Sequence, residues 1–114
     1  MSDNRPLAPT TIYLPDLLDF REIARSESTN HKSDTYQISL RSWGNGELYK
    51  LHASNPLLVK EIRNVDTDEL RQLFCAKYAR IDVFVEEKRL EFSSHTSFLF
   101  LLRFKTLELK IDSA

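Results

Sequence analysis

Two runs in which apolar and polar residues alternate flank Asn45-Gly46, within the stretch from Asp34 to Asn55. Asn-Gly favours a two-residue type I′ turn, because both central positions of that turn need a positive φ. The pattern therefore predicts a β-hairpin in which Gly44 pairs with Glu47 and Arg41 lies opposite Lys50. The apolar positions then share one face: Ile38, Leu40, Tyr49, Leu51 and Ala53. The other face carries the polar positions and two large apolar ones: Ser39, Arg41, Trp43, Leu48, Lys50 and His52.

The segment from Pro15 to Arg25 reads as a short amphipathic helix. Pro15 suits a first helical position, acidic residues come early and basic residues late, as the helix dipole favours. Its apolar stripe would be Tyr13, Leu17, Phe20 and Ala24. The polar run from Ser26 to Ser33 is then expected to be a flexible loop.

After the first hairpin, Leu57 to Ile62 is compatible with a third strand. The clearest helix start in the chain follows, because Asp66 can cap a helix and Glu69 stands three residues on. The apolar stripe of that helix is Leu70, Leu73, Phe74 and Tyr78. Alternation then predicts a second hairpin from Ile81 to Phe92, with its turn at Glu87-Lys88.

The last segment is apolar at almost every position from Phe98 to Phe104. Leu107, Leu109 and Ile111 then alternate with charged residues, which favours one long strand from Ser97 to Ile111. Its apolar face is even-numbered before Phe104 and odd-numbered afterwards. That change predicts a β-bulge or bend between Arg103 and Thr106.

These elements predict an α+β fold. It would have a mainly antiparallel sheet of about six strands (two hairpins plus the long bulged C-terminal strand) and two helices, in the order αβββαβββ. The length of 114 residues fits one domain, which we place at residues 11–114 after a flexible N-terminal arm at residues 1–10.

The composition limits the ligands and the cellular location that we expect for this protein. The 16 basic and 17 acidic residues nearly cancel, which argues against wholesale polyanion binding but not against a local basic patch. A single cysteine excludes an internal disulfide and indicates a reducing, cytoplasmic location. The sequence shows no signal peptide, and its longest apolar run, five residues, is far too short for a membrane span.

Sequence motifs for catalysis and cofactors are absent. Two glycines are too few for a phosphate-binding loop, and His31, His52 and His95 are too far apart to form a metal motif. Cys75 could be a nucleophile with a distant histidine, but its place beside Leu73 and Phe74 favours a small core residue. We therefore expect no enzyme activity, no cofactor, no metal and no catalytic residue.

The outward face of the first hairpin is the predicted binding surface. Its candidate residues are Arg41, Trp43, Leu48, Lys50 and His52. Like charges opposite each other, as expected for Arg41 and Lys50, are destabilising unless an anion or an acidic partner lies between them. An aromatic ring beside cations suits a protein partner and also single-stranded nucleic acid. The structural alternative is that Trp43 packs on Leu48 and the charges only solvate the sheet.

A second candidate surface is the apolar strand, which would form a homodimer if it lay at a sheet edge. Its contact residues would be Phe98, Leu99, Phe100 and Leu101; the alternative is a strand buried within one chain. The sequence thus predicts a small non-enzymatic protein-interaction or regulatory module, with a homodimer as one option for its assembly. The alternative function is an OB-like binder of single-stranded nucleic acid that uses the same hairpin face.

Overall fold

Residues 8–28 and 31–112 are described by the structure, a computed structural model, and they form ten strands and one helix. Six strands make one antiparallel sheet, in the spatial order β1 (Thr10–Tyr13), β7 (Arg80–Phe84), β8 (Arg89–Ser93), β9 (Phe98–Arg103), β5 (Leu57–Leu58) and β6 (Arg63–Asn64). The other four make a second antiparallel sheet, in the order β10 (Thr106–Asp112), β4 (Leu48–Ser54), β3 (His31–Arg41) and β2 (Asp16–Ser28).

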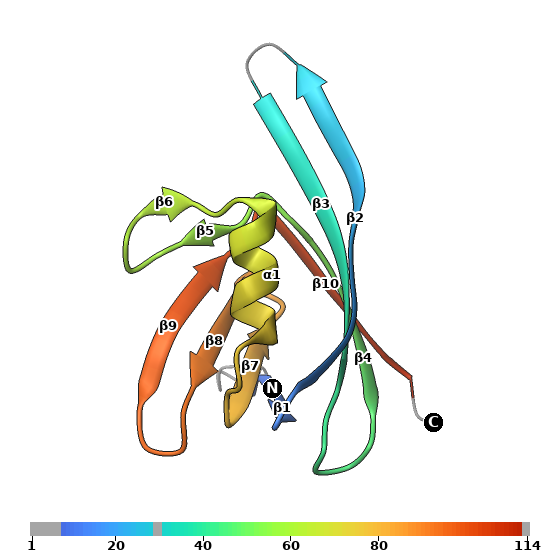
Figure 1. Cartoon of the computed structure of the whole chain (residues 1–114), viewed down its shortest axis with the longest axis vertical. Coiled ribbons are helices and arrows are strands. Elements are labelled where there is room, and N and C mark those ends of the chain that lie inside the picture. Colours follow the sequence, from blue (N-terminus) through green and yellow to red (C-terminus); the bar gives the residue numbers. More distant parts are fainter. Residues whose placement is uncertain (1–7, 29–30, 113–114) are drawn as a thin grey trace, which may run out of the picture.

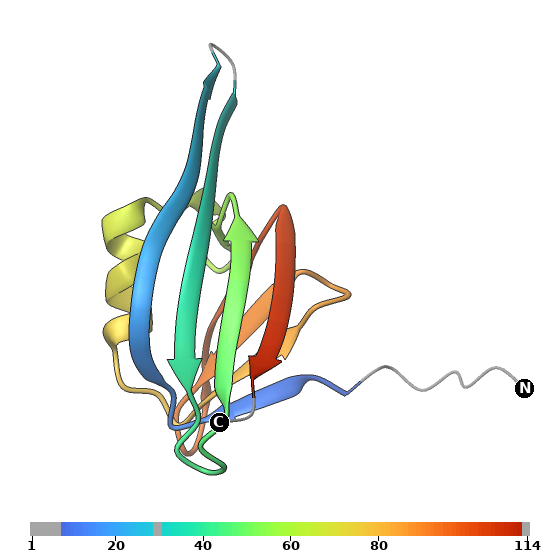
Figure 2. The ribbon, with the colours of Figure 1, turned by 90° about the vertical axis from the view of Figure 1, so that its right-hand side faces the viewer.

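The two sheets lie face to face, and the helix α1 (Thr67–Cys75) runs beside β2 along one open side (Figures 1 and 2). Their inward faces meet in one core. The largest fully buried side chains there are Tyr36, Phe92, Ile12, Ile38, Leu40, Leu51, Leu70, Ile81, Leu90 and Leu102. Phe92 lies at the centre of an aromatic cluster with ring centroids 5.4 Å from Phe74, 5.1 Å from Tyr78 and 4.6 Å from Phe100.

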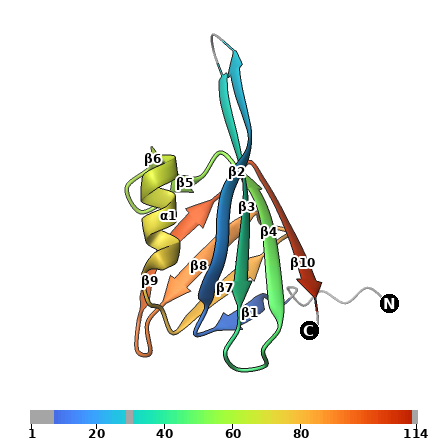
Figure 3. The ribbon, with the colours of Figure 1, turned by 45° about the vertical axis from the view of Figure 1, so that its right-hand side comes forward.

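The chain passes between the sheets three times. Leu14 and Pro15 join β1 of the first sheet to β2 of the second, Asn55 and Pro56 join β4 back to β5 of the first, and Phe104 and Lys105 join β9 to β10 of the second. The strands β2 and β3 also continue past the end of β4, so the pair forms a two-stranded arm that projects from the sandwich (Figure 3).

The predicted helix from Pro15 to Arg25 is wrong, because this segment is the strand β2. Register shifts fall between Leu17 and Asp19 and between Glu22 and Ala24. Each shift inserts one extra residue into β2. Because of the first shift, Leu17 and Phe20 point to the same side although they are three residues apart, and both pack against the core. Apolar residues three apart are also typical of one face of a helix, so the sequence pattern of this strand resembles that of an amphipathic helix.

The predicted turn of the first hairpin is also wrong, although its faces are correct. Arg41 pairs with Leu48 and Ser39 with Lys50, two residues away from the predicted register. Gly46 has a φ of 71°, but Asn45 has no positive φ, so the two-residue type I′ turn does not form. A shift of two residues preserves the side to which each side chain points. The predicted core face is therefore confirmed, with all five of its residues buried.

The fold class predicted from the sequence is contradicted. The described chain has two sheets of six and four strands and one helix, instead of one sheet of about six strands and two helices. Leu57 to Ile62 yields only the two-residue strand β5, followed by a turn. The expected loop from Ser26 to Ser33 is mostly strand, with residues 29–30 outside the described part. Of the predicted arm, residues 1–7 also lie outside it, and Thr10 already belongs to β1.

Three other predictions are confirmed. Asp66 caps α1, where its carboxylate accepts the Glu69 N–H at 2.8 Å. The strands β7 and β8 form the second hairpin. The bend predicted between Arg103 and Thr106 is present, and it carries the chain from one sheet to the other. The single long strand predicted from Ser97 to Ile111 is wrong, because this bend divides the segment into β9 and β10, which lie in different sheets. Within the described residues, no helix is long and apolar enough to cross a bilayer.

Candidate functional site

A cluster of hydrogen bonds at one end of the sandwich connects the β3–β4 loop to the end of β1. The Ser42 hydroxyl is fully buried; it accepts the Tyr13 N–H at 3.1 Å and donates to the Tyr13 carbonyl at 3.2 Å. The Trp43 N–H donates to the same carbonyl at 3.0 Å. Within the loop, the Gly46 N–H donates to the Ser42 carbonyl at 2.8 Å. These bonds fix the backbone on both sides of Trp43.

Three large apolar side chains are exposed around this cluster of hydrogen bonds. The exposed fraction is 71% for Trp43, 56% for Tyr13 and 49% for Leu14. We call these three residues the Trp43 patch. They come from the β3–β4 loop, from the end of β1 and from the corner after it, so only the folded chain brings them together.

Leu14 adopts a left-handed backbone conformation with a φ of 45°. This region is unfavourable for a residue with a Cβ, and a bulky residue there is an outlier. Two contacts hold it: the Leu14 N–H donates to the Ala79 carbonyl at 2.8 Å, and the preceding Tyr13 is fixed by Ser42. Strain of this kind persists only where the surroundings impose it, and it is frequent at binding sites.

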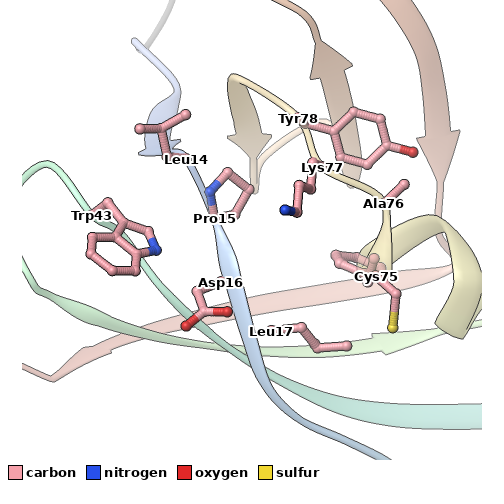
Figure 4. A pocket seen from close by; sticks show the side chains of 10 residues that line it. Leu14, Pro15, Asp16, Leu17, Trp43, Cys75, Ala76, Lys77 and Tyr78 are labelled. Carbon is pink, nitrogen blue, oxygen red and sulfur yellow. The ribbon is translucent and has the colours of Figure 1, made fainter.

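A cleft of about 530 Å³ opens beside the Trp43 patch. Leu14 to Leu17 and Trp43 line one side, and the end of α1 with the loop after it, Phe74 to Tyr78, lines the other. Figure 4 shows Trp43 and Tyr78 at opposite ends of the cleft, with Pro15 and Lys77 between them. The walls are thus mostly apolar, with one acid, Asp16, and one base, Lys77.

The two charges in the cleft and the tyrosine have different surroundings. Asp16 and Lys77 are exposed, and neither forms an ion pair within the described part of the chain. Tyr78 packs edge-on against Phe92 and Phe100, and its burial raises the pKa of its phenol above the usual value. The cleft can therefore offer two free charges and one neutral hydroxyl to a ligand.

Cys75 does not lie where the sequence pattern placed it. It is the last residue of α1, it is exposed, and it lines the cleft. The predicted core role is wrong, because α1 buries the face of Leu70 and Phe74, and Cys75, the next residue around the helix, points away from that face. The described residues contain no group of three or more His, Cys, Asp and Glu side chains that could hold a metal.

The structure separates the predicted binding residues. Trp43 lies in the loop, while Arg41, Leu48, Lys50 and His52 lie on the outer face of the four-stranded sheet. Arg41 does not face Lys50, so the predicted repulsion between them is absent. Lys50 instead lies between Ser39 and Lys110, with its amino group 3.6 Å from the Asp112 carboxylate.

The four predicted dimer residues differ in their surroundings. Phe98 and Leu99 are 55% and 38% exposed. Phe100 stacks on Phe92 inside the sandwich, and the Leu101 carbonyl accepts the Val59 N–H at 3.1 Å. The strand β9 lies between β8 and β5, so only the part of it before Leu101 forms an edge. A dimer contact through Phe98 and Leu99 stays a prediction.

Sequence reasoning missed Tyr13, Leu14 and Lys77. The sequence pattern places Tyr13 in the core stripe of a helix that does not form, and Lys77 follows a helix whose end it does not predict. One signal was available: a large apolar residue directly before Pro15 is restricted in its backbone and marks a corner. Comparison with protein-family models, with curated proteins and with solved structures finds no match to this chain.

Proposed function

We propose that this protein is a small protein-interaction or regulatory module that acts by binding and not by catalysis, with the Trp43 patch as its contact surface. The observation that carries the proposal is the joint exposure of Tyr13, Leu14 and Trp43, each about half exposed or more, on adjoining segments. Single exposed apolar residues are ordinary, whereas contiguous ones mark interaction sites.

The patch suits a protein partner in its chemistry. Trp and Tyr are among the residues that contribute most to protein interfaces. The backbone around Trp43 is already fixed by Ser42 and Tyr13, so a partner would meet little additional cost of ordering it. The neighbouring cleft is large enough to receive side chains from the partner, and Asp16 and Lys77 would form its polar rim.

Binding of single-stranded nucleic acid is the alternative, and the exposed Trp43 ring with Arg41 two residues before it supports it. The charge of the adjoining sheet face weighs against it. The outward positions of that face carry as many acids as bases: Asp16, Asp19, Glu108 and Asp112 against Arg21, Arg41, Lys50 and Lys110. Nucleic-acid affinity depends on an excess of basic groups.

A cytoplasmic location is part of the proposal, and the lone cysteine is the feature that supports it. Such a module would need no cofactor.

The test uses two matched variants of the full chain. Trp43→Ala removes the centre of the patch, and Ile62→Ala is the control, because Ile62 is 80% exposed but lies in the β5–β6 loop. We expect a partner captured by the wild type and by Ile62→Ala to be lost with Trp43→Ala. With the partner purified, removal of Trp43 should cost about 2 kcal/mol or more, roughly thirtyfold in Kd.

Trp43 is the only tryptophan, so its fluorescence reports directly on the patch. A purified protein partner should change that fluorescence saturably and with little dependence on salt. Equal capture by Trp43→Ala and the wild type would contradict the proposed surface. A saturable change with single-stranded DNA or RNA that weakens steeply with salt would favour the nucleic-acid alternative instead.

A further inference from the structure

We propose that the strand β10 is a dimerisation edge, which pairs antiparallel with β10 of a second copy of this chain about a two-fold axis at Leu109. This surface is distinct from the Trp43 patch. Three features support it: the open backbone of β10, the order of its side chains and an unfavourable charge pair within one chain.

The strand β10 is the long, regular open edge of the described sandwich. It has seven residues, lies at one edge of the four-stranded sheet (red in Figure 2), and pairs with β4 without a register shift. The opposite edge, β2, has two register shifts and α1 beside it. In the six-stranded sheet, the edge strand β6 has two residues and β1 has four, of which Tyr13 is already bonded to the β3–β4 loop. Within the described residues, β10 has no bulge and no element covering its outer edge, and it is not short, so three of the usual protections against edge pairing are missing. The protection that β10 does have is charge, and its charged side chains oppose pairing only in registers that bring like charges together.

Alternation along the ladder shows which backbone groups of β10 are open. Asn55 directly follows β4, and its N–H donates to the Asp34 carbonyl at 3.0 Å. The odd-numbered residues of β4 therefore direct their backbone groups toward β3. The even-numbered residues of β4 therefore bond β10, and their register partners are Thr106, Glu108, Lys110 and Asp112. The N–H and C=O groups of Leu107, Leu109 and Ile111 consequently point away from β4, toward the open edge.

The side chains of β10 are self-complementary about Leu109. In antiparallel pairing, Leu109 meets Leu109 of the second copy and Leu107 meets Ile111. Each of these pairs would exchange two backbone hydrogen bonds, because all three residues present open groups. On the outer face, Glu108 meets Lys110 and Lys110 meets Glu108. A two-fold axis at residue 108 or 110 would instead oppose two glutamates or two lysines, so the charges select the axis at Leu109.

Two features of the single chain favour this pairing. Lys110 lies directly opposite Lys50, which is an unfavourable like-charge pair, and neither Glu108 nor Lys110 forms an ion pair within the described residues. Glu108 of the second copy would lie beside Lys110 and compensate that repulsion. Ile111 is 49% exposed and Leu109 is half-buried, so pairing would also cover apolar surface on the inner face.

Charge reversal tests the pairing. The full chain should have the mass of a dimer by sedimentation or light scattering at a chain concentration on the order of 100 μM, where contacts of micromolar Kd are occupied. Glu108→Lys and Lys110→Glu should each weaken the dimer by about tenfold, because each turns two attractive pairs into two repulsive ones. The double variant Glu108→Lys/Lys110→Glu restores opposite charges across the interface and should restore the dimer.

The double variant is its own control for folding, and far-UV circular dichroism should be the same in all four proteins. Trp43→Ala should leave the dimer intact. A wild type that remains a monomer at this concentration would overturn the proposal. It would also be overturned if single reversals left the dimer unchanged, if the double variant failed to restore it, or if Phe98→Ser dissolved it instead.

Discussion

The backbone strain at Leu14 can be measured by comparing two substitutions. Leu14→Gly and Leu14→Ala both remove the half-exposed side chain, so the two variants lack nearly the same apolar surface. They differ at the backbone, because glycine adopts a positive φ without a steric cost and alanine does not. The difference in the free energy of unfolding between the two variants therefore isolates the strain.

The expected magnitude follows from two opposing effects. The left-handed conformation favours Leu14→Gly over Leu14→Ala by about 1–2 kcal/mol, because glycine has no Cβ. The larger freedom of glycine in the unfolded chain favours Leu14→Ala by roughly 0.4–1 kcal/mol. Because the φ of Leu14 is 45°, the first effect should dominate. The glycine variant should then be the more stable by about 1 kcal/mol.

The assay is urea unfolding followed by far-UV circular dichroism, with Leu18 as the matched position. Leu18 is 44% exposed and has no positive φ, so there alanine should be more stable than glycine by about 0.5–1 kcal/mol. Glycine should thus give the more stable variant at position 14, and alanine the more stable variant at position 18. If alanine were the more stable at both positions, the backbone of Leu14 would carry no strain, and the rigid Trp43 patch would lose one of its supports.

Three further outcomes follow from the contacts of α1 and the core. Asp66→Ala should destabilise the fold by about 1 kcal/mol in thermal unfolding, because the Glu69 N–H loses its cap, and Asp66→Asn should retain most of that stability. Arg63 donates two hydrogen bonds to Glu69 and lowers the pKa of that carboxyl. The pair therefore stabilises the fold above the ordinary Glu pKa of 4.5 and loses this contribution as the pH falls below it. The difference in urea midpoint between the wild type and Glu69→Gln should shrink over that range, and a constant difference would contradict the assignment. Phe92→Ala should cost about 3–5 kcal/mol, because Phe92 is fully buried, and a loss below about 1 kcal/mol would show that the aromatic cluster is not the centre of the core.

Local signals predicted those elements whose structure depends on neighbours in the sequence. The cap at Asp66 needs only Glu69 three residues later, and the structure has that hydrogen bond. The reversal in apolar parity near Phe104 located the bend between β9 and β10 correctly. Alternation also assigned the buried face of the first hairpin, because a shift of two residues in register leaves each side chain on its own side.

Local signals failed where a distant segment changed the local preference. Asn45-Gly46 favours a two-residue turn, but Ser42 and Trp43 bond Tyr13 of β1, and the loop lengthens around that contact. The spacing of Leu17 and Phe20 reads as helical, but the register shift between Leu17 and Asp19 produces the same spacing in a strand. A bulge is set by pairing with β3, so no single-segment pattern could reveal it.

The amino-acid sequence is enough to predict the capped helix, the second hairpin, the bend between Arg103 and Thr106 and the buried face of the first hairpin, because these depend on contacts within a few residues or on strict alternation. The division of the strands into two sheets, the meeting of Trp43 with Tyr13 and Leu14, and the open edge at β10 became visible only in the folded chain. These features depend on which segments pair across long stretches of chain. Pairing is set by the burial of the whole core, which no local pattern encodes.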